Sequence, residues 1–415
     1  MSLLKPIAAA LARGALWLEQ RWLWCVSGKA RAAIALAQRH DHLLHCTVYP
    51  STDKIYGGGF IHQRVKHYAA AGLTVLVFQR TRAHQTTIRT FDGVTVIEGR
   101  DALFATLLDQ HTFDRVLVHF LSERTWEILA PRLRQSALLV WIHGADIQPW
   151  HERDFSAKAR SAKAKRRSDA RVGFWRRLVA VLPPRCTLVF VSAYLRDQLP
   201  TYIGRPLPPD TTAVIHNPIN TDLFRYIAKP AAQRLKILSI RPYTSEVYAN
   251  DIAVQAITLL AQRPCFSVLS FHLIGDGSLF DATVAPLRDF PNVTIERHFL
   301  LQTEIAARHQ DYGVFLIPTR MDSHGVSRDE AMASGLVPIT SRVAAIPEFV
   351  DETCAMLTPP DDAAAIAAAI EHLHDHPEHF TALSAAAAAR VRRQAGHEIT
   401  IPQELALLRG SGQEG

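Results

Sequence analysis

The segment 314–340 constrains the fold of this chain more than any other part of the sequence. Residues 314–317 form an apolar run followed by a proline, which is typical of a buried parallel strand. A polar loop leads to a predicted helix over about 326–334, and Gly335 stands where a C-terminal cap is expected. A second short strand is predicted at 336–340. This order of strand, loop, helix and strand predicts a unit of a parallel α/β sheet.

Two carboxylates lie on either side of the start of this helix. Asp322 is in the loop, and Glu330 follows eight positions later, inside the helix. The backbone N–H groups of Gly325, Val326 and Ser327 are the unpaired donors of the first turn, and such a terminus favours an anion, above all a phosphate. Carboxylates on either side of a bound diphosphate could hold hydroxyl-rich groups. A nucleotide sugar has that layout, since its diphosphate joins a hexose to a ribose.

The motif Asp322-x7-Glu330, followed by Ala-Met-Ala-Ser-Gly-Leu-Val-Pro, resembles the Glu-x7-Glu signature of retaining glycosyltransferases of the family 4 type (glycosyl transferases group 1). The chain has Asp in place of the first Glu, which keeps the charge and shortens the reach by one methylene. The resemblance implies a GT-B fold, in which two Rossmann-like, doubly wound parallel-sheet domains face each other across a cleft. It also implies that Asp322 contacts the donor sugar and that Glu330 binds the ribose.

Other elements of the C-terminal half carry the same resemblance. Arg241 follows a predicted strand and matches the family's phosphate-binding arginine. The lysine usually found shortly after it is missing from the matching region 246–251. Either Arg241 acts with another cation, for which Arg320 is a candidate, or donor phosphate binding is weaker. Leu-Ile-Gly-Asp-Gly at 273–277 resembles the Gly-Asp-Gly turn of the same domain. The resemblance therefore implies donor-binding roles for Arg241, Gly275, Asp276, Arg320, His324, Gly325, Val326, Ser327 and Glu330.

The N-terminal half carries a weaker form of the resemblance. After a predicted strand at 42–49, Gly57, Gly58 and Gly59 open a helix, at a position where backbone approaches a ligand closely. The resemblance makes them the loop that faces the donor phosphates and the acceptor. His143 ends another strand and is followed by glycine, which matches the family's His-Gly element near the transferred sugar. His143 is therefore a catalytic candidate, together with Asp322 and Glu330.

Strands and helices alternate along this half of the chain, which favours a parallel, doubly wound sheet. His119 also ends a strand, and for this residue a structural role is the favoured interpretation. After the first strand, further strands are predicted at 73–78, 94–98, 115–120, 137–142, 187–191 and 212–215.

A chain of 415 residues is too long for one typical core and predicts two domains. The expected organisation is a basic, tryptophan-rich helical lead-in at 1–40, an acceptor domain at 41–225, a nucleotide-sugar domain at 235–395, and a helix and tail at 396–415 that returns to the first domain. The five cysteines are scattered without a CxxC pair, and no apolar run is long enough to span a membrane. We therefore expect a cytoplasmic protein.

The formal net charge of +7 comes from one segment, 152–177, which holds ten Lys and Arg against three acids. Two interpretations of this segment remain open: it binds an anionic membrane surface, or it is a solvated charged helix. The lead-in 1–40 is likewise either an interfacial membrane helix or a helix packed on the first domain. Nucleic acid is not an expected partner, because no recognition motif accompanies the basic run.

Together these features predict retaining transfer of a sugar from a nucleoside diphosphate sugar to a hydroxyl of a glycan or lipid-linked acceptor, in cell-surface polysaccharide or glycolipid synthesis. The alternatives are a membrane-associated nucleotide-sugar-binding protein with little activity, and a nucleotide-sugar epimerase. No metal is expected, since Arg241 and the helix terminus supply positive charge. The histidines at 372–379 are expected to be a solvated helix end. A lipid-linked acceptor would place the protein peripherally on the inner face of the membrane.

Overall fold

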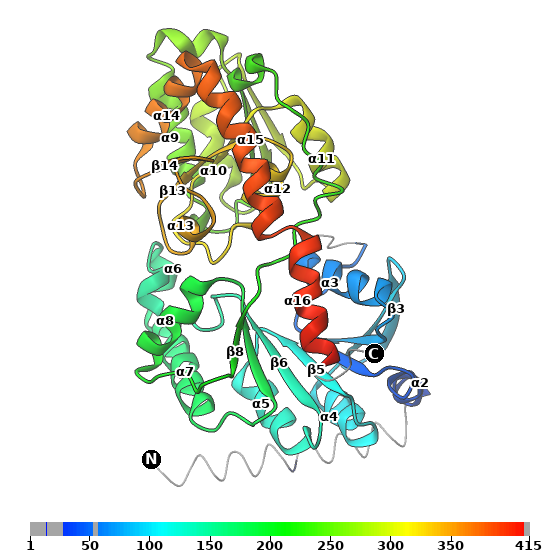
Figure 1. Ribbon diagram of the computed structural model, residues 1–415. Helices are drawn as coiled ribbons and strands as arrows, with labels where there is room; N and C mark the ends of the chain where they lie inside the picture. The colour runs from blue at the N-terminus through cyan, green and yellow to red at the C-terminus, as the bar shows by residue number, and fades with distance from the viewer. Residues whose placement is uncertain (1–13, 15–27, 53–56, 411–415) are drawn as a thin grey trace.

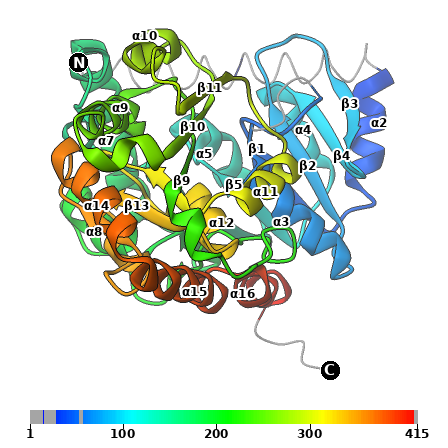
Figure 2. The same cartoon turned by 90° about the horizontal axis from the view of Figure 1, so that it is seen from above.

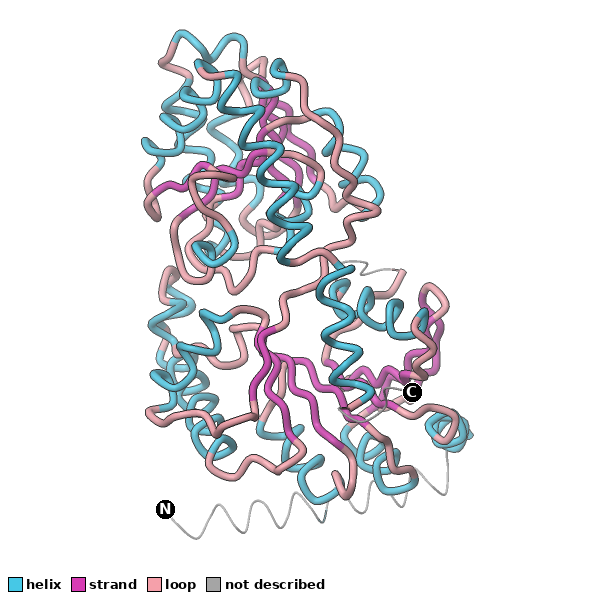
Figure 3. The backbone as a smooth tube through the Cα atoms, viewed as in Figure 1, coloured by secondary structure: helices cyan, strands magenta, loops and turns pink. Residues whose placement is uncertain are grey.

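The computed structural model describes residues 14, 28–52 and 57–410, which form two α/β domains (Figure 1). Each domain contains one sheet with helices packed on it, and the two domains lie one above the other in Figure 3. The N-terminal sheet has eight strands in the order β3-β4-β2-β1-β5-β6-β7-β8, and the C-terminal sheet has six in the order β11-β10-β9-β12-β13-β14. The predicted pair of doubly wound domains is therefore confirmed.

All neighbouring strands of the N-terminal sheet are parallel except β3 and β4, which are antiparallel. Successive residues of β1 face two different cores, since Leu43 belongs to one apolar cluster and Leu44 to another. Burial of both faces explains why its central strands read as continuous apolar runs. The strands are β1 His42–Cys46, β2 Val75–Arg80, β3 Thr87–Phe91, β4 Val94–Gly99, β5 Arg115–His119, β6 Ala137–Ile142, β7 Cys186–Phe190 and β8 Thr212–Val214.

The helices of this domain connect the strands and cover the sheet. They are α2 Gly28–Ala37, α3 Gly59–Ala70, α4 Asp101–Gln110, α5 Glu123–Leu129, α6 Ala157–Arg160, α7 Ala162–Val179 and α8 Ala193–Ile203, with 3-10 turns η1 Ala130–Arg132 and η2 Trp150–Arg153. Three of them, α5, α7 and α8, begin with serine caps: the side chains of Ser122, Ser161 and Ser192 accept from the N–H groups of Thr125, Ala164 and Leu195.

The C-terminal sheet is parallel throughout. Its strands are β9 Lys236–Ile240, β10 Ser270–Gly275, β11 Val293–Arg297, β12 Val314–Ile317, β13 Val337–Ser341 and β14 Met356–Thr358. Its helices are α9 Asn250–Leu260, α10 Phe280–Val284, α11 Gln302–Asp311, α12 Val326–Ala333, α13 Ile346–Phe349, α14 Ala363–Asp375 and α15 Pro377–Gln394, with 3-10 turns η3 Ala231–Leu235, η4 Glu246–Tyr248, η5 Pro264–Val268 and η6 Ala285–Leu287.

The last helix, α16 His397–Arg409, leaves the C-terminal domain and packs on the N-terminal one (Figures 1 and 2). Glu404 on α16 is fully buried and accepts a hydrogen bond from Arg64 Nε of α3 at 2.8 Å, and Tyr68 donates to the same carboxylate. Arg64 also donates to Asn217 Oδ1, in the segment between the domains, at 3.0 Å. The predicted return of the chain end to the first domain is therefore confirmed.

The predicted strands are all present, with ends that differ by up to three residues; the largest difference is at β1, predicted to end at residue 49 and ending at Cys46. The antiparallel edge strand β3 was not predicted, because its short polar sequence Thr-Ile-Arg-Thr-Phe lacks the apolar run of the buried strands. It lies at the edge of the sheet, where it pairs with a single neighbouring strand, β4.

Candidate functional site

The segment that dominates the sequence forms a strand–loop–helix–strand unit, as predicted. β12 is buried throughout, and α12 begins after Gly325, whose φ of 94° lies in the left-handed region that favours glycine. Gly325 offers no side-chain cap, so the N–H groups of Val326 and Ser327 remain available to an anion. Asp322 is half-buried in the loop, where its Oδ1 accepts from the N–H of His324 at 3.1 Å.

Arg241 lies beside this helix terminus. It follows β9, is 5% exposed, and donates from Nη1 to Ser327 Oγ at 3.3 Å. Its guanidinium lies over the ring of Tyr248 at 4.8 Å, and its Nε is buried with no hydrogen-bond partner. Burial lowers the pKa of Arg241, and the charge of Asp322 acts against that shift. A buried cation without an ion pair at a helix N-terminus is a suitable contact for a phosphate.

Glu330 lies on the buried side of α12, next to the first turn of α11. Burial raises the pKa of its carboxyl to about 8; a hydrogen bond with Gln302 opposes the shift and the charge of Asp329 adds to it. The ligand-free carboxyl is therefore protonated at neutral pH. In that form it can donate a hydrogen bond to a hydroxyl as well as accept one.

Two of the expected donor-binding residues, Arg320 and Asp276, have other partners in this structure, and a third, Gly275, has a packing role. Arg320 donates to both oxygens of Asp251, at 2.9 and 2.7 Å, and pairs with Asp361 at 2.7 Å. Its charge is thus compensated, which does not support Arg320 as the second phosphate cation. Asp276 is bound to Arg297 at 2.8 Å on an exposed surface. Gly275 ends β10, where a Cβ would lie 1.9 Å from the backbone oxygen of Arg241, so glycine allows the two strand ends to approach.

The side chain of His324 is 2% exposed, and both ring nitrogens are occupied. Nε2 bonds Asp329 Oδ2 at 2.9 Å, and Nδ1 accepts from the N–H of Asn217 at 3.1 Å. The ring also stacks on Phe349, with centroids 4.2 Å apart. Burial lowers the pKa of His324, although Asp329 opposes the shift. This arrangement supports a role for the ring in holding the loop against the interdomain segment, and it does not support the expected donor contact.

His143 follows β6 and lies at the domain interface. Its backbone oxygen accepts from Ser323 Oγ at 2.6 Å, so the loop that carries Asp322 touches the end of the N-terminal sheet. Its ring shares a hydrogen bond with His119, between Nε2 and Nδ1 at 2.9 Å, and the two rings stack. Burial lowers the pKa of His143 well below its ordinary value, with a smaller contribution from Arg64. The imidazole is therefore neutral.

The glycine turn lies at the same edge of the sheet as His143. α3 begins at Gly59, and the ring of Phe60, the next residue, is 4.8 Å from that of His143. Gly58 has a φ of 78°, and a Cβ there would lie 2.7 Å from the backbone oxygen of Val48. Close backbone packing therefore requires glycine at 58, whereas a Cβ on Gly59 would meet no atom within 4 Å. Gly57 precedes Gly58 in the same turn.

Glu348 makes a second interdomain contact. Its carboxylate accepts from the N–H groups of Ala193 and Tyr194, the first residues of α8, at 2.8 and 2.9 Å. It also bonds His216 Nε2 at 3.1 Å. A carboxylate of the C-terminal domain thus caps a helix of the N-terminal domain, which stabilises this arrangement of the two domains.

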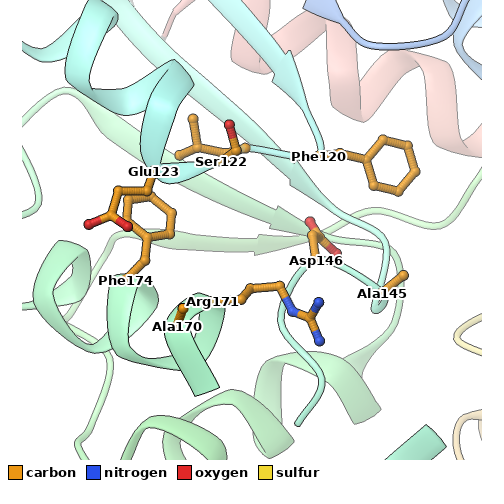
Figure 4. A pocket seen from close by; sticks show the side chains of 9 residues that line it. Phe120, Ser122, Glu123, Ala145, Asp146, Ala170, Arg171 and Phe174 are labelled. Carbon is orange, nitrogen blue, oxygen red and sulfur yellow. The ribbon is translucent and has the colours of Figure 1, made fainter. Parts of the chain in front are cut away.

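A pocket of about 360 Å³ opens next to His143 in the N-terminal domain (Figure 4). Asp146 Oδ1 accepts from the N–H of His143 at 3.1 Å, whereas its Oδ2 is buried with no partner, as is Nε of Arg171. Burial raises the pKa of the Asp146 carboxyl to about 6. The walls are mainly apolar, and the pocket is lined by Phe120, Leu121, Ser122, Glu123, Ala145, Asp146, Ala170, Arg171 and Phe174.

Much of the basic segment 152–177 makes contacts within the protein. Arg171 donates to the backbone oxygen of Gln148, and Arg176 to that of Ile203. The apolar face of α7 is buried in the core of the N-terminal domain and includes Phe174, Trp175, Leu178 and Val179. That face is therefore not available for insertion into a membrane. The interpretation of 152–177 as a membrane-binding segment is corrected to this extent. The exposed cations of α7 are Arg176 and Arg177, which bond the backbone oxygen of Ile203 and the carboxylate of Glu123, together with Lys163, Arg166 and Arg167.

The lead-in 1–40 is described only in part. Its helix α2 buries Ala30, Ala33, Ile34 and Ala37 against the first domain, so packing is confirmed for this portion. The prediction for most of residues 1–27 lies outside the described residues. Within the described part of the chain, no helix is long and apolar enough to cross a membrane. The same part contains no group of three His, Cys, Asp or Glu residues arranged to hold a metal ion.

Solved structures with the same two-domain arrangement are glycosyltransferases of the GT-B class. A glycosyltransferase from Rickettsia africae has a TM-score of 0.67 at 15% identity, covering 90% of this chain and 100% of that one. Sucrose-phosphate synthase from Thermosynechococcus elongatus has a TM-score of 0.66 at 18% sequence identity, and the match covers 89% of this chain and 98% of that one. HepE from Anabaena, in complex with UDP and glucose, has a TM-score of 0.64 at 14% sequence identity, and the match covers 90% of this chain and 100% of that one. No curated protein is similar enough in sequence to match.

Residues 235–376 match the family model of glycosyl transferases group 1. This range covers β9 to α14 and includes Arg241 and the Asp322-x7-Glu330 motif. The resemblance to glycosyl transferases group 1 seen in the sequence is therefore confirmed for this part of the chain.

Proposed function

We propose that this protein is a retaining glycosyltransferase that takes its sugar from a nucleoside diphosphate sugar. The observation that carries the proposal is the position of Arg241, which is buried beside the uncapped N-terminus of α12 and forms no ion pair with any residue that the structure describes. Asp322 stands before that terminus and Glu330 beyond it. A diphosphate bound there would have one carboxyl group on the side of the sugar and the other on the side of the ribose.

In the proposed reaction, Arg241 and the N–H groups at the start of α12 stabilise the negative charge that grows on the departing diphosphate. Preorganised donors of this kind often supply the largest single contribution to catalysis. Asp322 orients the donor sugar, and Glu330 binds the ribose hydroxyls. The neutral imidazole of His143 lies beside the reacting sugar. Because these groups supply positive charge and hydrogen bonds, we expect activity to survive chelation of divalent ions by EDTA.

UDP is the first nucleotide to test, because the similar Anabaena protein has been crystallised with UDP, with UDP and glucose, and with UDP-glucose. The acceptor is proposed to be a hydroxyl of a glycan or of a lipid-linked glycan precursor. Two features support this choice: the open pocket beside His143 and the exposed cations Lys163, Arg166 and Arg167 on α7, which suit an anionic membrane surface. The corresponding role is cell-surface polysaccharide or glycolipid synthesis, with the enzyme peripheral on the inner face of the membrane.

The first experiment is a thermal-shift screen of the full chain against UDP, GDP, ADP, CMP and their common sugars. A ligand at about 100 times its Kd stabilises the folded state by about 2.7 kcal/mol, which gives a readable shift. We expect one nucleoside diphosphate to stabilise the wild type and to have much less effect on Arg241→Ala. No shift with any of these ligands would refute the donor site.

Product analysis separates the proposed activity from its alternatives. With the donor identified, transfer to a hydroxyl acceptor is expected, and Asp322→Asn should lower turnover at least about 100-fold while the nucleoside diphosphate still binds. A changed sugar configuration in a donor that stays intact would identify an epimerase. Donor binding without turnover, in the presence of glycan and lipid-linked acceptors, would identify a nucleotide-sugar-binding protein.

A further inference from the structure

The donor site in the C-terminal domain has fewer cations than a diphosphate requires. Each phosphoryl group of the donor carries a negative charge, and the diphosphate gains a further charge as it leaves. Arg241 and Arg328 are both buried at α12; the guanidinium of Arg241 lies over the ring of Tyr248, and that of Arg328 is paired with Asp329. Arg320 is neutralised by Asp251 and Asp361. The second positive charge therefore has to come from elsewhere in the protein.

Arg153 of the N-terminal domain lies next to this site. It ends η2, in the segment between β6 and α7, and is half-buried at the domain interface. Its Nη1 donates to Gln148 Oε1 at 3.1 Å, and Gln148 Nε2 contacts Met321 Sδ of the C-terminal domain at 3.2 Å. Met321 directly precedes Asp322. One glutamine side chain thus connects the guanidinium to the loop that holds the first carboxylate.

The charges around Arg153 also point to the donor site. Burial lowers the pKa of Arg153, while Tyr248 and Asp322 act against the shift, and the same two residues act on Arg241. Arg171 is the other cation close enough to interact with Arg153. Within residues 28–52 and 57–410, Arg153 forms no ion pair, and its guanidinium remains charged because arginine does not lose its proton at neutral pH. Two uncompensated guanidinium groups, one from each domain, thus share Asp322 as a neighbour.

We propose that Arg153 is a donor-binding residue that supplies the second cation for the diphosphate from the N-terminal domain. This inference rests on the proposed function. Arginine suits the role because its planar fork of N–H groups can bind two phosphate oxygens at once. Binding of the diphosphate then connects the two domains through Arg153 and Arg241. The donor accordingly stabilises the arrangement of the domains that brings His143 next to Asp322.

Calorimetric titration of the full chain with UDP, GDP and ADP, and with the matching nucleoside monophosphates, tests this role. For the diphosphate that binds best, Arg153→Gln should raise Kd by about 10- to 100-fold, the range for loss of a charge-assisted hydrogen bond. The monophosphate should lose less affinity, because it presents fewer phosphate oxygens. Arg153→Lys keeps the charge and should recover part of the diphosphate affinity. The matched control is Arg167→Gln, which removes an exposed cation of α7 and should bind like the wild type.

The outcomes separate this inference from the proposed function. In one outcome, the wild type binds a diphosphate, Arg241→Gln loses this binding, and Arg153→Gln binds like the wild type. The role of Arg153 is then refuted, and the donor site stands. Equal losses of diphosphate and monophosphate affinity in Arg153→Gln, without rescue by Arg153→Lys, would show a structural effect and would also refute it. If the wild type binds none of the three diphosphates, the proposed function itself fails.

Discussion

The buried carboxyl of Glu330 makes a quantitative prediction about pH and stability. Its pKa is about 8 in the folded protein, against an ordinary value of 4.5. A raised pKa means that the folded state holds a proton that the unfolded state releases. The contribution to stability is therefore complete below about pH 4.5 and is lost as the pH rises towards about 8. Between these limits, each pH unit should lower the free energy of unfolding by about 1.4 kcal/mol.

Replacement by glutamine isolates this effect. Glu330→Gln has nearly the same shape and no titrating proton, so the pH dependence of all other groups cancels in the difference between variant and wild type. From about pH 5.5 to about pH 7.5, the variant should gain about 2.7 kcal/mol of stability relative to the wild type. Glu378→Gln is the matched control, because Glu378 is exposed at the start of α15. Its difference from the wild type should stay small and constant.

The assay has to follow the C-terminal domain. All seven tryptophans precede residue 176, so tryptophan fluorescence reports on the N-terminal half of the chain. Native-state hydrogen exchange of the amides of β12 and α12, corrected for the pH dependence of intrinsic exchange, measures local stability around Glu330. A difference between Glu330→Gln and the wild type that does not change with pH would mean that the carboxyl is ionised in the folded protein, and the reasoning from burial would be wrong.

Two further predictions concern the support of the site. Glu404→Gln leaves the fully buried guanidinium of Arg64 without its ion pair and should lower the free energy of unfolding by about 3–5 kcal/mol. Urea unfolding followed by tryptophan fluorescence measures this loss. An unchanged unfolding midpoint would contradict the importance of this pair. Gly325→Ala places a Cβ 2.7 Å from Nη1 of Arg328, at a residue whose φ is 94°. The substitution should destabilise α12 by about 1–3 kcal/mol, measured by hydrogen exchange of its amides. Protection equal to that of the wild type would show that the turn relaxes without cost.

Local sequence determined the central part of the proposed donor site. An apolar run, a polar loop, a helix start and a glycine stop are short-range signals, and they predicted β12, α12 and β13 with ends correct to within one or two residues. The motif from Asp322 to Glu330 lies within this unit, so its spacing alone placed both carboxylates around the helix terminus. The parallel sheets followed from the same kind of signal, because strands that are buried on both faces must be apolar along their length.

Tertiary structure decided which charged groups can act at the site. Arg320 was a reasonable phosphate contact in the sequence, but Asp251 and Asp361, each at least 40 positions away, compensate its charge. Arg153 was one cation in a basic run, and only the packing of the two domains brings it next to Asp322. The signal that points to it is the missing lysine, because the proposed donor site then takes its second cation from another part of the chain.

The same distinction applies to burial. The sequence identified Phe174 and Trp175 as aromatic residues in a basic segment, while the fold determined that they pack in the core. The sequence marked Glu330 as a carboxylate, and burial of α12 determines that it holds a proton. Helices, strands and the turn around Gly325 depend on neighbouring residues and can be predicted from the sequence. Ion pairs and pKa values depend on contacts between residues far apart in the chain, and these are defined only once the chain has folded.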